Sequence, residues 1–168
     1  MEKIRGRVWK FGDKIDTDVI YPGRYLKITD PEETAKHCFE TVYPWFMEKA
    51  KPGDIIVAGK FFGCGSSREQ AATCLKYFGI GAIVAESFAR IYYRNAINLG
   101  LPIVVCPGIT RHVEEGDIIE IDMEKGVIKN ERTGEEITFT PLPDFVLDIF
   151  RKGGLIPYLR EKLVDKTP

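Results

Sequence analysis

The sequence lacks the patterns that mark several large classes of protein. No apolar run approaches the roughly 20 residues that cross a bilayer, and residues 1–6 contain no apolar signal region. Lys and Arg (24) nearly balance Asp and Glu (25), which leaves a net charge of -1. Such a balance does not favour nucleic acid or a membrane surface as a partner. We therefore expect a cytoplasmic protein that binds neither.

Metal-ligand and nucleotide-binding patterns are also missing. The cysteines stand far apart, form no C-x-x-C pair, and have neither histidine (His37, His112) close by in sequence. We therefore expect no zinc or iron–sulfur site made by this chain alone. The phosphate-binding patterns G-x-x-x-x-G-K-[ST] and G-x-G-x-x-G are absent as well. We expect buried free thiols at all four cysteines: Cys38, Cys64, Cys74 and Cys106.

The sequence does contain a glycine-rich loop between an apolar run and a helical pattern. Residues 54–59 predict a strand, residues 63–69 (GCGSSRE) a loop, and residues 67–78 an amphipathic helix. At such a junction, free backbone N–H groups and the positive end of the helix dipole converge. Two hydroxyls and a guanidinium in the same turn favour an anionic ligand. Ser66 and Glu69 also fit the S-x-x-E capping box, which needs no ligand.

Apolar strands alternate with helices through the middle of the chain. We expect strands at 55–58, 80–85 and 101–106, connected by helices at 67–78 and 89–99. This alternation predicts an α/β fold with a parallel βαβαβ core, covered on both faces and joined by right-handed crossovers. Ligands of such sheets bind beyond the carboxyl ends of the strands, which is where the glycine-rich loop would lie.

The flanking segments complete the predicted fold as one domain over residues 1–168. A short strand is expected at 5–11, and Asp30-Pro31 begins a helix that should reach about Phe39. After Val113, three short strands with glycine turns predict an added β-meander. Two C-terminal helices, at 143–152 and 155–163, follow it. Residues 162–168 are expected to fray.

Charged residues lie between the first strand and this first helix. Asp16 and Asp18 would share one face of an extended chain, and they also fit turn aspartates that bond local backbone N–H groups. Arg24 and Lys27 could reach an anion or remain solvated surface charges.

Four ordered motifs give the chain a family resemblance. They are VWKFGD at 8–13 with DTD at 16–18, PGRYL at 22–26, FGCGSSRE at 62–69, and AESFARIYYRNAINLG at 85–100. Together they resemble the small subunits of 3-isopropylmalate dehydratase and of its relative homoaconitase, which correspond to the swivelling C-terminal domain of aconitase. The resemblance covers nearly the whole chain and implies a swivelling β/β/α domain.

The resemblance also implies an activity and the residues that perform it. The enzyme would be a two-chain hydro-lyase that isomerises 2- and 3-isopropylmalate in leucine biosynthesis. A large subunit would carry a [4Fe–4S] cluster as Lewis acid, and this chain would close over the substrate. By position in the motifs, Ser66 would remove the proton beside a carboxylate, and Ser67 and Arg68 would hold a substrate carboxylate. Asp18 and Gly65 would support them. If Ser66 serves only as a cap, Ser67 becomes the candidate base.

The identity of the substrate stays open at this point. Tyr25, Leu26, Lys27 and Ile28 occupy the loop that reads the variable group of the substrate in this family. A small apolar loop suits an isopropyl group and an arginine suits an extra carboxylate, but Lys27 followed by Ile28 fits neither pattern. Lys27 could pair with a carboxylate, or its stem could pack on an alkyl group. Homoaconitase and citramalate-type substrates are the alternatives. A non-catalytic module that binds a dicarboxylate is the alternative from another class.

Overall fold

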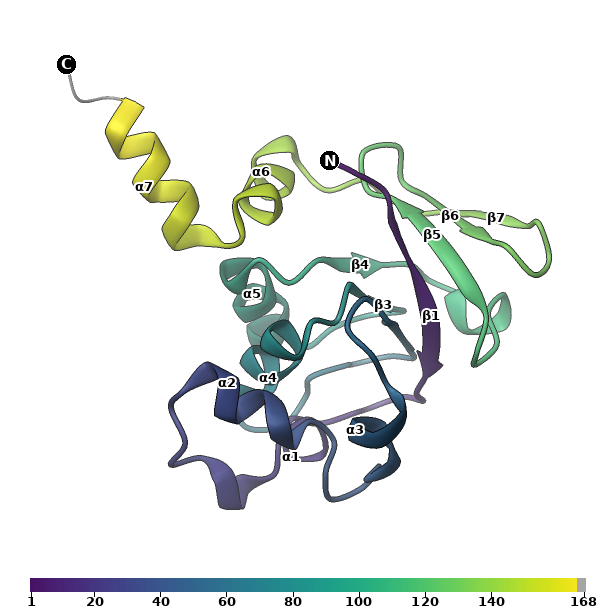
Figure 1. Cartoon of the computed structure of the whole chain (residues 1–168). Helices are drawn as coiled ribbons and strands as arrows, with labels where there is room; N and C mark the ends of the chain where they lie inside the picture. Colours follow the sequence, from purple (N-terminus) through teal and green to yellow (C-terminus); the bar gives the residue numbers. More distant parts are fainter. Residues whose placement is uncertain (166–168) are drawn as a thin grey trace.

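The computed structural model describes residues 1–165, and its centre is a seven-stranded sheet (Figure 1). The strand order is β4-β3-β2-β1-β5-β6-β7. Strands β1 to β4 are mutually parallel, and β5, β6 and β7 each run antiparallel to the preceding neighbour. The strands are β1 (Ile4–Lys10), β2 (Ile55–Ala58), β3 (Ala82–Ala85), β4 (Ile103–Val105), β5 (Ile118–Asp122), β6 (Val127–Asn130) and β7 (Glu136–Thr138).

Strands β2 and β3 form the buried middle of the parallel half. Every residue of both strands is buried, which is typical of a parallel sheet covered on both faces. Helix α4 (Gln70–Phe78) connects β2 to β3, helix α5 (Arg90–Leu99) connects β3 to β4, and the two helices pack against each other. Each ends at a left-handed glycine, Gly79 or Gly100. The predicted βαβαβ core is therefore confirmed.

Strand β1 joins this parallel half to an antiparallel one. Val8 pairs with Ile55 of β2 in parallel, and Ile4 pairs with Ile121 of β5 in antiparallel orientation. Strands β5, β6 and β7 form the predicted meander, which buries alternate side chains such as Ile119. A 3-10 turn, η3 (Ile109–Arg111), connects β4 to the meander and packs on β2 and β3. The sequence predicted both halves, and the structure adds the position of β1 between them.

Short helices and turns fill the long connection from β1 to β2. Asp30 caps one of them by accepting a hydrogen bond from a first-turn N–H (3.1 Å), as predicted. In chain order these elements are α1 (Thr17–Ile20), η1 (Gly23–Tyr25), α2 (Pro31–Thr34), η2 (Ala35–His37) and α3 (Trp45–Lys49).

The helix predicted to run from Asp30 to Phe39 is shorter than expected. Helix α2 ends at Thr34, the chain tightens into the 3-10 turn η2, and Phe39 adopts a φ of +57°. The reason is packing: the fully buried Phe39 ring stacks on Phe11 (centroids 4.6 Å apart) and contacts Phe46 (4.8 Å). Burial of these aromatic rings outweighs continuation of an exposed helix.

Two helices close the described part of the chain. Helix α6 (Asp144–Lys152) ends at Gly153, and α7 (Leu155–Asp165) packs on α5 and α6 and projects from the body (Figure 1). Helix α7 ends at Asp165, beyond the predicted end at residue 163, and residues 166–168 of the segment predicted to fray lie outside the described residues. No helix within residues 1–165 combines the length and apolarity needed to span a membrane. The predicted α/β fold with meander and C-terminal helices is confirmed.

Candidate functional site

Three loops meet where the parallel strands end. They follow β1, β2 and β3, and backbone hydrogen bonds join them. The Gly63 N–H donates to the Ile15 carbonyl (2.7 Å), and the Phe62 N–H donates to the Ser87 carbonyl (3.1 Å). The glycine-rich loop is the middle one. It therefore lies at the carboxyl end of the parallel sheet, where such sheets bind ligands.

Gly63 lets this loop pass directly over helix α5. Its φ is +84°, and a Cβ atom there would lie 2.2 Å from the ring of Tyr92. That ring is almost fully buried, and its hydroxyl donates to the Ala71 carbonyl of α4 (3.0 Å). Because the ring cannot move aside, only glycine fits at this position.

The two serines of the loop precede helix α4 and do not open it. Helix α4 begins at Gln70 without a side-chain cap, so both the predicted start at Ser67 and the Ser66–Glu69 capping box are wrong. The physical reason lies in the neighbouring segment. The Thr17 hydroxyl donates to the Ser66 carbonyl (2.7 Å), and the Thr17 N–H donates to another carbonyl of the loop (2.8 Å). These bonds direct the loop toward α1.

The loop presents a row of unused hydrogen-bond donors. Among residues 1–165, the six consecutive N–H groups from Gly65 to Gln70 find no acceptor, and neither the Ser66 nor the Ser67 hydroxyl makes a hydrogen bond. Both serines are exposed. Consecutive free N–H groups attract anions. The arrangement can therefore hold a carboxylate, although its donors come from a loop and not from the first turn of a helix.

Arg68 is held over this loop by Asp18. Its Nη1 atom lies 2.6 Å from the Asp18 Oδ1 and donates to the Tyr21 carbonyl (3.3 Å). Asp18 also accepts a hydrogen bond from the Gly23 N–H (2.9 Å). The hydrogen bond from Arg68 is the main cause that holds the pKa of Asp18 below its usual range. The remaining guanidinium donors of Arg68 meet no acceptor in the described chain, so they are available to a carboxylate.

Asp16 and Asp18 have different roles, because helix α1 begins between them. Asp16 is the N-cap of α1 and accepts a hydrogen bond from the Val19 N–H (2.9 Å), as a turn aspartate would. Asp18 lies within the helix and reaches Arg68. The alternative in which both share one face of an extended chain is therefore wrong. The turn-aspartate interpretation is confirmed, because Asp16 and Asp18 each accept a hydrogen bond from a nearby backbone N–H.

The segment Tyr25–Ile28 adjoins the same loop. Gln70 of α4, two residues beyond Arg68, donates from Nε2 to the Leu26 carbonyl (3.1 Å). Leu26 is 38% exposed, and Lys27 is exposed. Lys27 has no hydrogen bond or ion pair within the described residues. Both side chains are therefore accessible to a ligand in this region.

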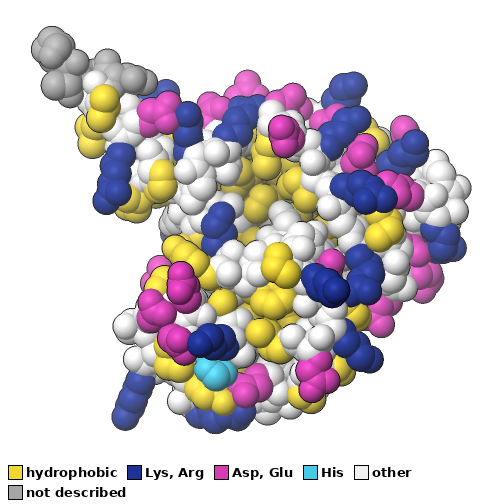
Figure 2. All heavy atoms as spheres, viewed as in Figure 1, with side chains coloured by type: hydrophobic (Ala, Val, Ile, Leu, Met, Phe, Trp, Pro, Cys, Tyr) yellow, Lys and Arg dark blue, Asp and Glu magenta, His cyan; other side chains and the backbone are white. Residues whose placement is uncertain are grey.

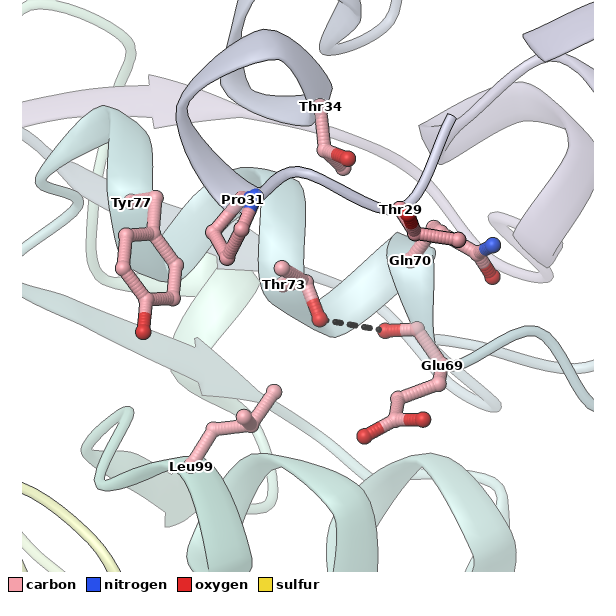
Figure 3. A pocket seen from close by; sticks show the side chains of 8 residues that line it. All are labelled: Thr29, Pro31, Thr34, Glu69, Gln70, Thr73, Tyr77 and Leu99. Carbon is pink, nitrogen blue, oxygen red and sulfur yellow. Dashed lines mark hydrogen bonds between the residues drawn. The ribbon is translucent and has the colours of Figure 1, made fainter. Parts of the chain in front are cut away.

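A pocket of about 240 Å³ borders the first turn of α4 (Figure 3). The Thr73 hydroxyl donates to the Glu69 backbone carbonyl (3.2 Å), and the Glu69 carboxylate points away from α4 into the pocket. This orientation is consistent with the missing capping box. The pocket is lined by Thr29, Pro31, Thr34, Glu69, Gln70, Thr73, Tyr77 and Leu99.

The thiols differ in their surroundings. Cys38, Cys74 and Cys106 are buried free thiols as expected, whereas Cys64 is partly exposed between the two glycines of the loop, which corrects that expectation. Burial is the main cause that raises the pKa of Cys106 to about 11. Within residues 1–165, no three His, Cys, Asp or Glu side chains gather in a way that could hold a metal ion.

Three residues that contact the site were not identified from sequence. Thr17 lies within the DTD motif at 16–18 and Gln70 directly follows the motif at 62–69, so a polar residue inside or beside a motif is the signal that could have found them. His37 gave no such signal, yet its ring stacks on Tyr25 with centroids 3.7 Å apart.

Comparison with known proteins places this geometry in a family. Residues 7–107 match the aconitase C-terminal domain, and these residues contain all three loops of the site. A solved structure of 3-isopropylmalate dehydratase from Methanocaldococcus jannaschii superposes with a TM-score of 0.92 and 46% identity, covering 98% of each chain.

Curated relatives match over almost their full length. The 3-isopropylmalate dehydratase small subunit 1 of Methanopyrus kandleri is 57% identical and covers 95% of this chain and 94% of its own. The small subunit from Aquifex aeolicus is 56% identical over 98% of both chains. An isopropylmalate/citramalate isomerase small subunit from Methanocaldococcus jannaschii is 55% identical over 96% of both. The chain therefore belongs to the aconitase C-terminal domain family and, within it, to the 3-isopropylmalate dehydratase small subunits.

Proposed function

We propose that this chain is the small subunit of a hydro-lyase that interconverts 2-isopropylmalate and 3-isopropylmalate in leucine biosynthesis. The observation that carries the proposal is the row of unused N–H donors around Ser66, flanked by Arg68. The names of relatives more than half identical to this chain support it.

In this proposal Ser66 is the base. A serine hydroxyl is a weak acid, so its alkoxide needs stabilisation by nearby donors and positive charge. The free N–H groups from Gly65 to Gln70 and the Arg68 guanidinium can provide both. Ser66 would take the proton from the carbon beside a substrate carboxylate, while the neighbouring carbon loses its hydroxyl. The substrate thereby loses the elements of water, with the proton on Ser66 and the hydroxyl released as hydroxide. Returning a proton and a hydroxyl to exchanged carbons gives the isomer.

Ser67 and Arg68 would hold the carboxylate that acidifies this proton. The donors that Arg68 does not use toward Asp18 can form a two-pronged bond with a carboxylate. Asp18 would keep the guanidinium oriented between turnovers. Gly65, with a φ of +94°, supports the turn that carries Ser66.

A large subunit would supply the groups that assist departure of the hydroxyl. We propose that this subunit holds a [4Fe–4S] cluster, as the resemblance to the aconitase family implies, and that the cluster would supply a Lewis acid for the departing hydroxyl. The relatives from Methanopyrus kandleri and Aquifex aeolicus are both named as small subunits, which supports a large subunit as the partner. Residues 1–168 would act as one domain that closes over it in the cytoplasm, where free thiols persist.

Neither nucleic acid nor a membrane is part of the proposal. Basic and acidic side chains are interspersed over the face in Figure 2, and the net charge is -1. The partner ligand would instead be a small di- or tricarboxylate.

A citramalate-type substrate is the second candidate. It is favoured by the relative from Methanocaldococcus jannaschii whose name includes both activities. A tricarboxylate of the homoaconitase type is a third substrate to compare, because the exposed Lys27 could pair with the additional carboxylate.

The test is reconstitution of this chain with a large subunit under anaerobic conditions. We expect turnover only in the mixture, with the highest kcat/KM for 3-isopropylmalate among 3-isopropylmalate, citraconate and homoaconitate. Preference for citraconate or homoaconitate would replace the substrate but keep the reaction class. Binding of a dicarboxylate by this chain without turnover in the mixture would contradict the enzyme proposal and favour a binding module.

A further inference from the structure

The backbone of the segment Tyr25–Ile28 is tied at two points. The hydroxyl of the fully buried Tyr21 donates to the Tyr25 carbonyl (2.8 Å), and Gln70 donates to the Leu26 carbonyl (3.1 Å). Both donors are close in sequence to residues of the site: Tyr21 directly follows α1, which contains Asp18, and Gln70 begins α4, two residues after Arg68. The segment is therefore fixed relative to Arg68 through its main chain.

The side chain of Tyr25 is tied separately, to η2. Its ring stacks on His37 with centroids 3.7 Å apart and planes inclined by 16°. His37 is held in turn by Glu40, whose carboxylate lies 2.9 Å from the imidazole Nδ1. Arg24 lies over the same tyrosine ring (4.8 Å) and 3.8 Å from Glu40. Four residues outside the reacting groups thus form one connected cluster.

The cluster orients residues that it does not touch. Leu26 and Lys27 follow Tyr25 directly and are exposed, and Lys27 has no partner of its own among residues 1–165. The positions of Leu26 and Lys27 therefore depend on two anchors: the stacked side chain of the preceding residue, Tyr25, and the hydrogen bond from Gln70 to the Leu26 carbonyl. A shift of Tyr25 would displace both without altering Ser66 or Arg68.

We propose that His37, held by Glu40, is a positioning residue for substrate selection, acting through its stack on Tyr25. This inference rests on the proposed function and on the role that the family resemblance implies for Tyr25–Ile28, which is to read the variable group of the substrate. Loss of the stack should change how well the enzyme distinguishes substrates, mainly through KM. The turnover number should stay close to normal, because Ser66 and Arg68 are anchored by other bonds.

The experiment compares variants of the reconstituted two-subunit enzyme. His37→Ala removes the ring and the bond to Glu40, whereas His37→Phe keeps a ring that can stack. We expect His37→Ala to reduce the ratio of kcat/KM for 3-isopropylmalate over citraconate about tenfold, and His37→Phe to restore most of it. The matched control is His112→Ala, which removes the other histidine and its contact with the Glu135 carboxylate (Nδ1 to Oε1, 2.8 Å). It should leave the ratio unchanged.

The outcomes separate the two proposals. If the ratio of kcat/KM values stays unchanged in His37→Ala, including the case in which both values fall by the same factor, the positioning role is overturned. The function is still upheld in that case, provided that the wild-type mixture is active. An inactive wild-type mixture would instead reject the function. The stack itself has its own readout in the free chain: the NMR signals of the His37 ring should lose their ring-current shift in Tyr25→Leu. No change in those signals would also overturn the inference.

Discussion

A buried polar cluster around Asp117 in the antiparallel half of the molecule is saturated with hydrogen bonds, whereas the donors around Ser66 in the glycine-rich loop of the parallel half are open. Asp117, only 6% exposed, accepts hydrogen bonds from the Glu114 N–H (2.8 Å), the Asn130 amide (2.9 Å) and Arg132 (2.6 and 3.1 Å). The hydroxyl of Ser66 makes no hydrogen bond within the described residues.

The difference separates polar groups that stabilise the fold from polar groups that remain available to a ligand. A buried carboxylate is tolerated only when its lone pairs are satisfied, so the Asp117 cluster is structural. Exposed donors without partners contribute nothing to the fold, so the row around Ser66 is free to serve chemistry. Mutations in the two regions should therefore separate stability from activity.

The largest expected effect is on turnover. Ser66→Ala should lower kcat by about 10³-fold, because it removes the proposed base. The melting temperature and complex formation should stay unchanged, since the hydroxyl has no partner in the described structure. Ser87→Ala is a control for the loop: that hydroxyl accepts the Phe61 N–H (2.9 Å), so its loss should lower stability. Near-normal turnover of Ser66→Ala would reject the base assignment.

The next effect is on stability. Asp117→Ala removes the acceptor of the Arg132 guanidinium and one of the two acceptors of the fully buried Asn130 amide, and should lower the free energy of unfolding by about 2–4 kcal/mol. Activity per folded molecule should not change. Urea titration measures the loss, with Glu136→Ala, an exposed glutamate of β7, as the control. A loss no greater than in this control would contradict the structural role.

The same cluster predicts a pH dependence. The hydrogen bond from Arg132 is the main cause that lowers the pKa of Asp117 to about 2, from an ordinary value of 3.8. A lowered folded-state pKa contributes stability that is present above the unfolded-state pKa and is lost as pH falls through the folded one. The stability difference between wild type and Asp117→Asn should therefore be constant above about pH 5 and shrink between about pH 4 and 2. Urea titrations across this range test it, and a constant difference at all pH values would be the contrary result.

A smaller effect is expected at Arg68, the proposed carboxylate-binding residue. Arg68→Lys loses the two-pronged donor geometry and should raise KM about tenfold. Its stability should hardly change, because the partner Asp18 is 66% exposed. Arg5→Lys is a matched control, since Arg5 makes a two-pronged pair with Glu131 (2.7 and 2.9 Å) away from the site. An unchanged KM in Arg68→Lys would remove Arg68 from substrate binding.

The smallest effect concerns the entry to the loop. Phe61 is 54% exposed and adopts a φ of +57°, which is unfavourable for a bulky residue. Phe61→Asn should stabilise the fold by about 1 kcal/mol, because asparagine tolerates this conformation better. Phe145→Asn, at an equally exposed phenylalanine within helix α6, should not stabilise it. Equal effects in a thermal unfolding series would show that backbone strain is not the cause.

The sequence predicted the fold well because periodicity reports burial. The continuous apolar runs at 55–58 and 80–85 identified strands β2 and β3 of the parallel core. Failures occurred where distant contacts override local preference. Phe39 leaves its predicted helix to join Phe11, which follows β1.

The motifs identified residues that do lie together in the structure, whereas the local structure predicted around them was partly wrong. Ser66, Arg68, Asp18 and Lys27 lie around one group of loops, although their roles remain predictions. The start of helix α4 was misplaced because a hydroxyl from Thr17, some fifty residues earlier in the chain, binds the Ser66 carbonyl. No local pattern encodes such a bond.

The central place of β1 has a consequence for biosynthesis of the chain. Strand β1 leaves the ribosome before both of its neighbours in the sheet: it pairs with β2 on one edge, but its other edge stays unpaired until β5 is made, since Ile4 pairs with Ile121. Until then the nascent chain exposes an unpaired strand edge, a known route to misassembly. Folding of this subunit should therefore be completed late in synthesis, and a truncation that removes residues 4–10 should divide the sheet into two separate halves.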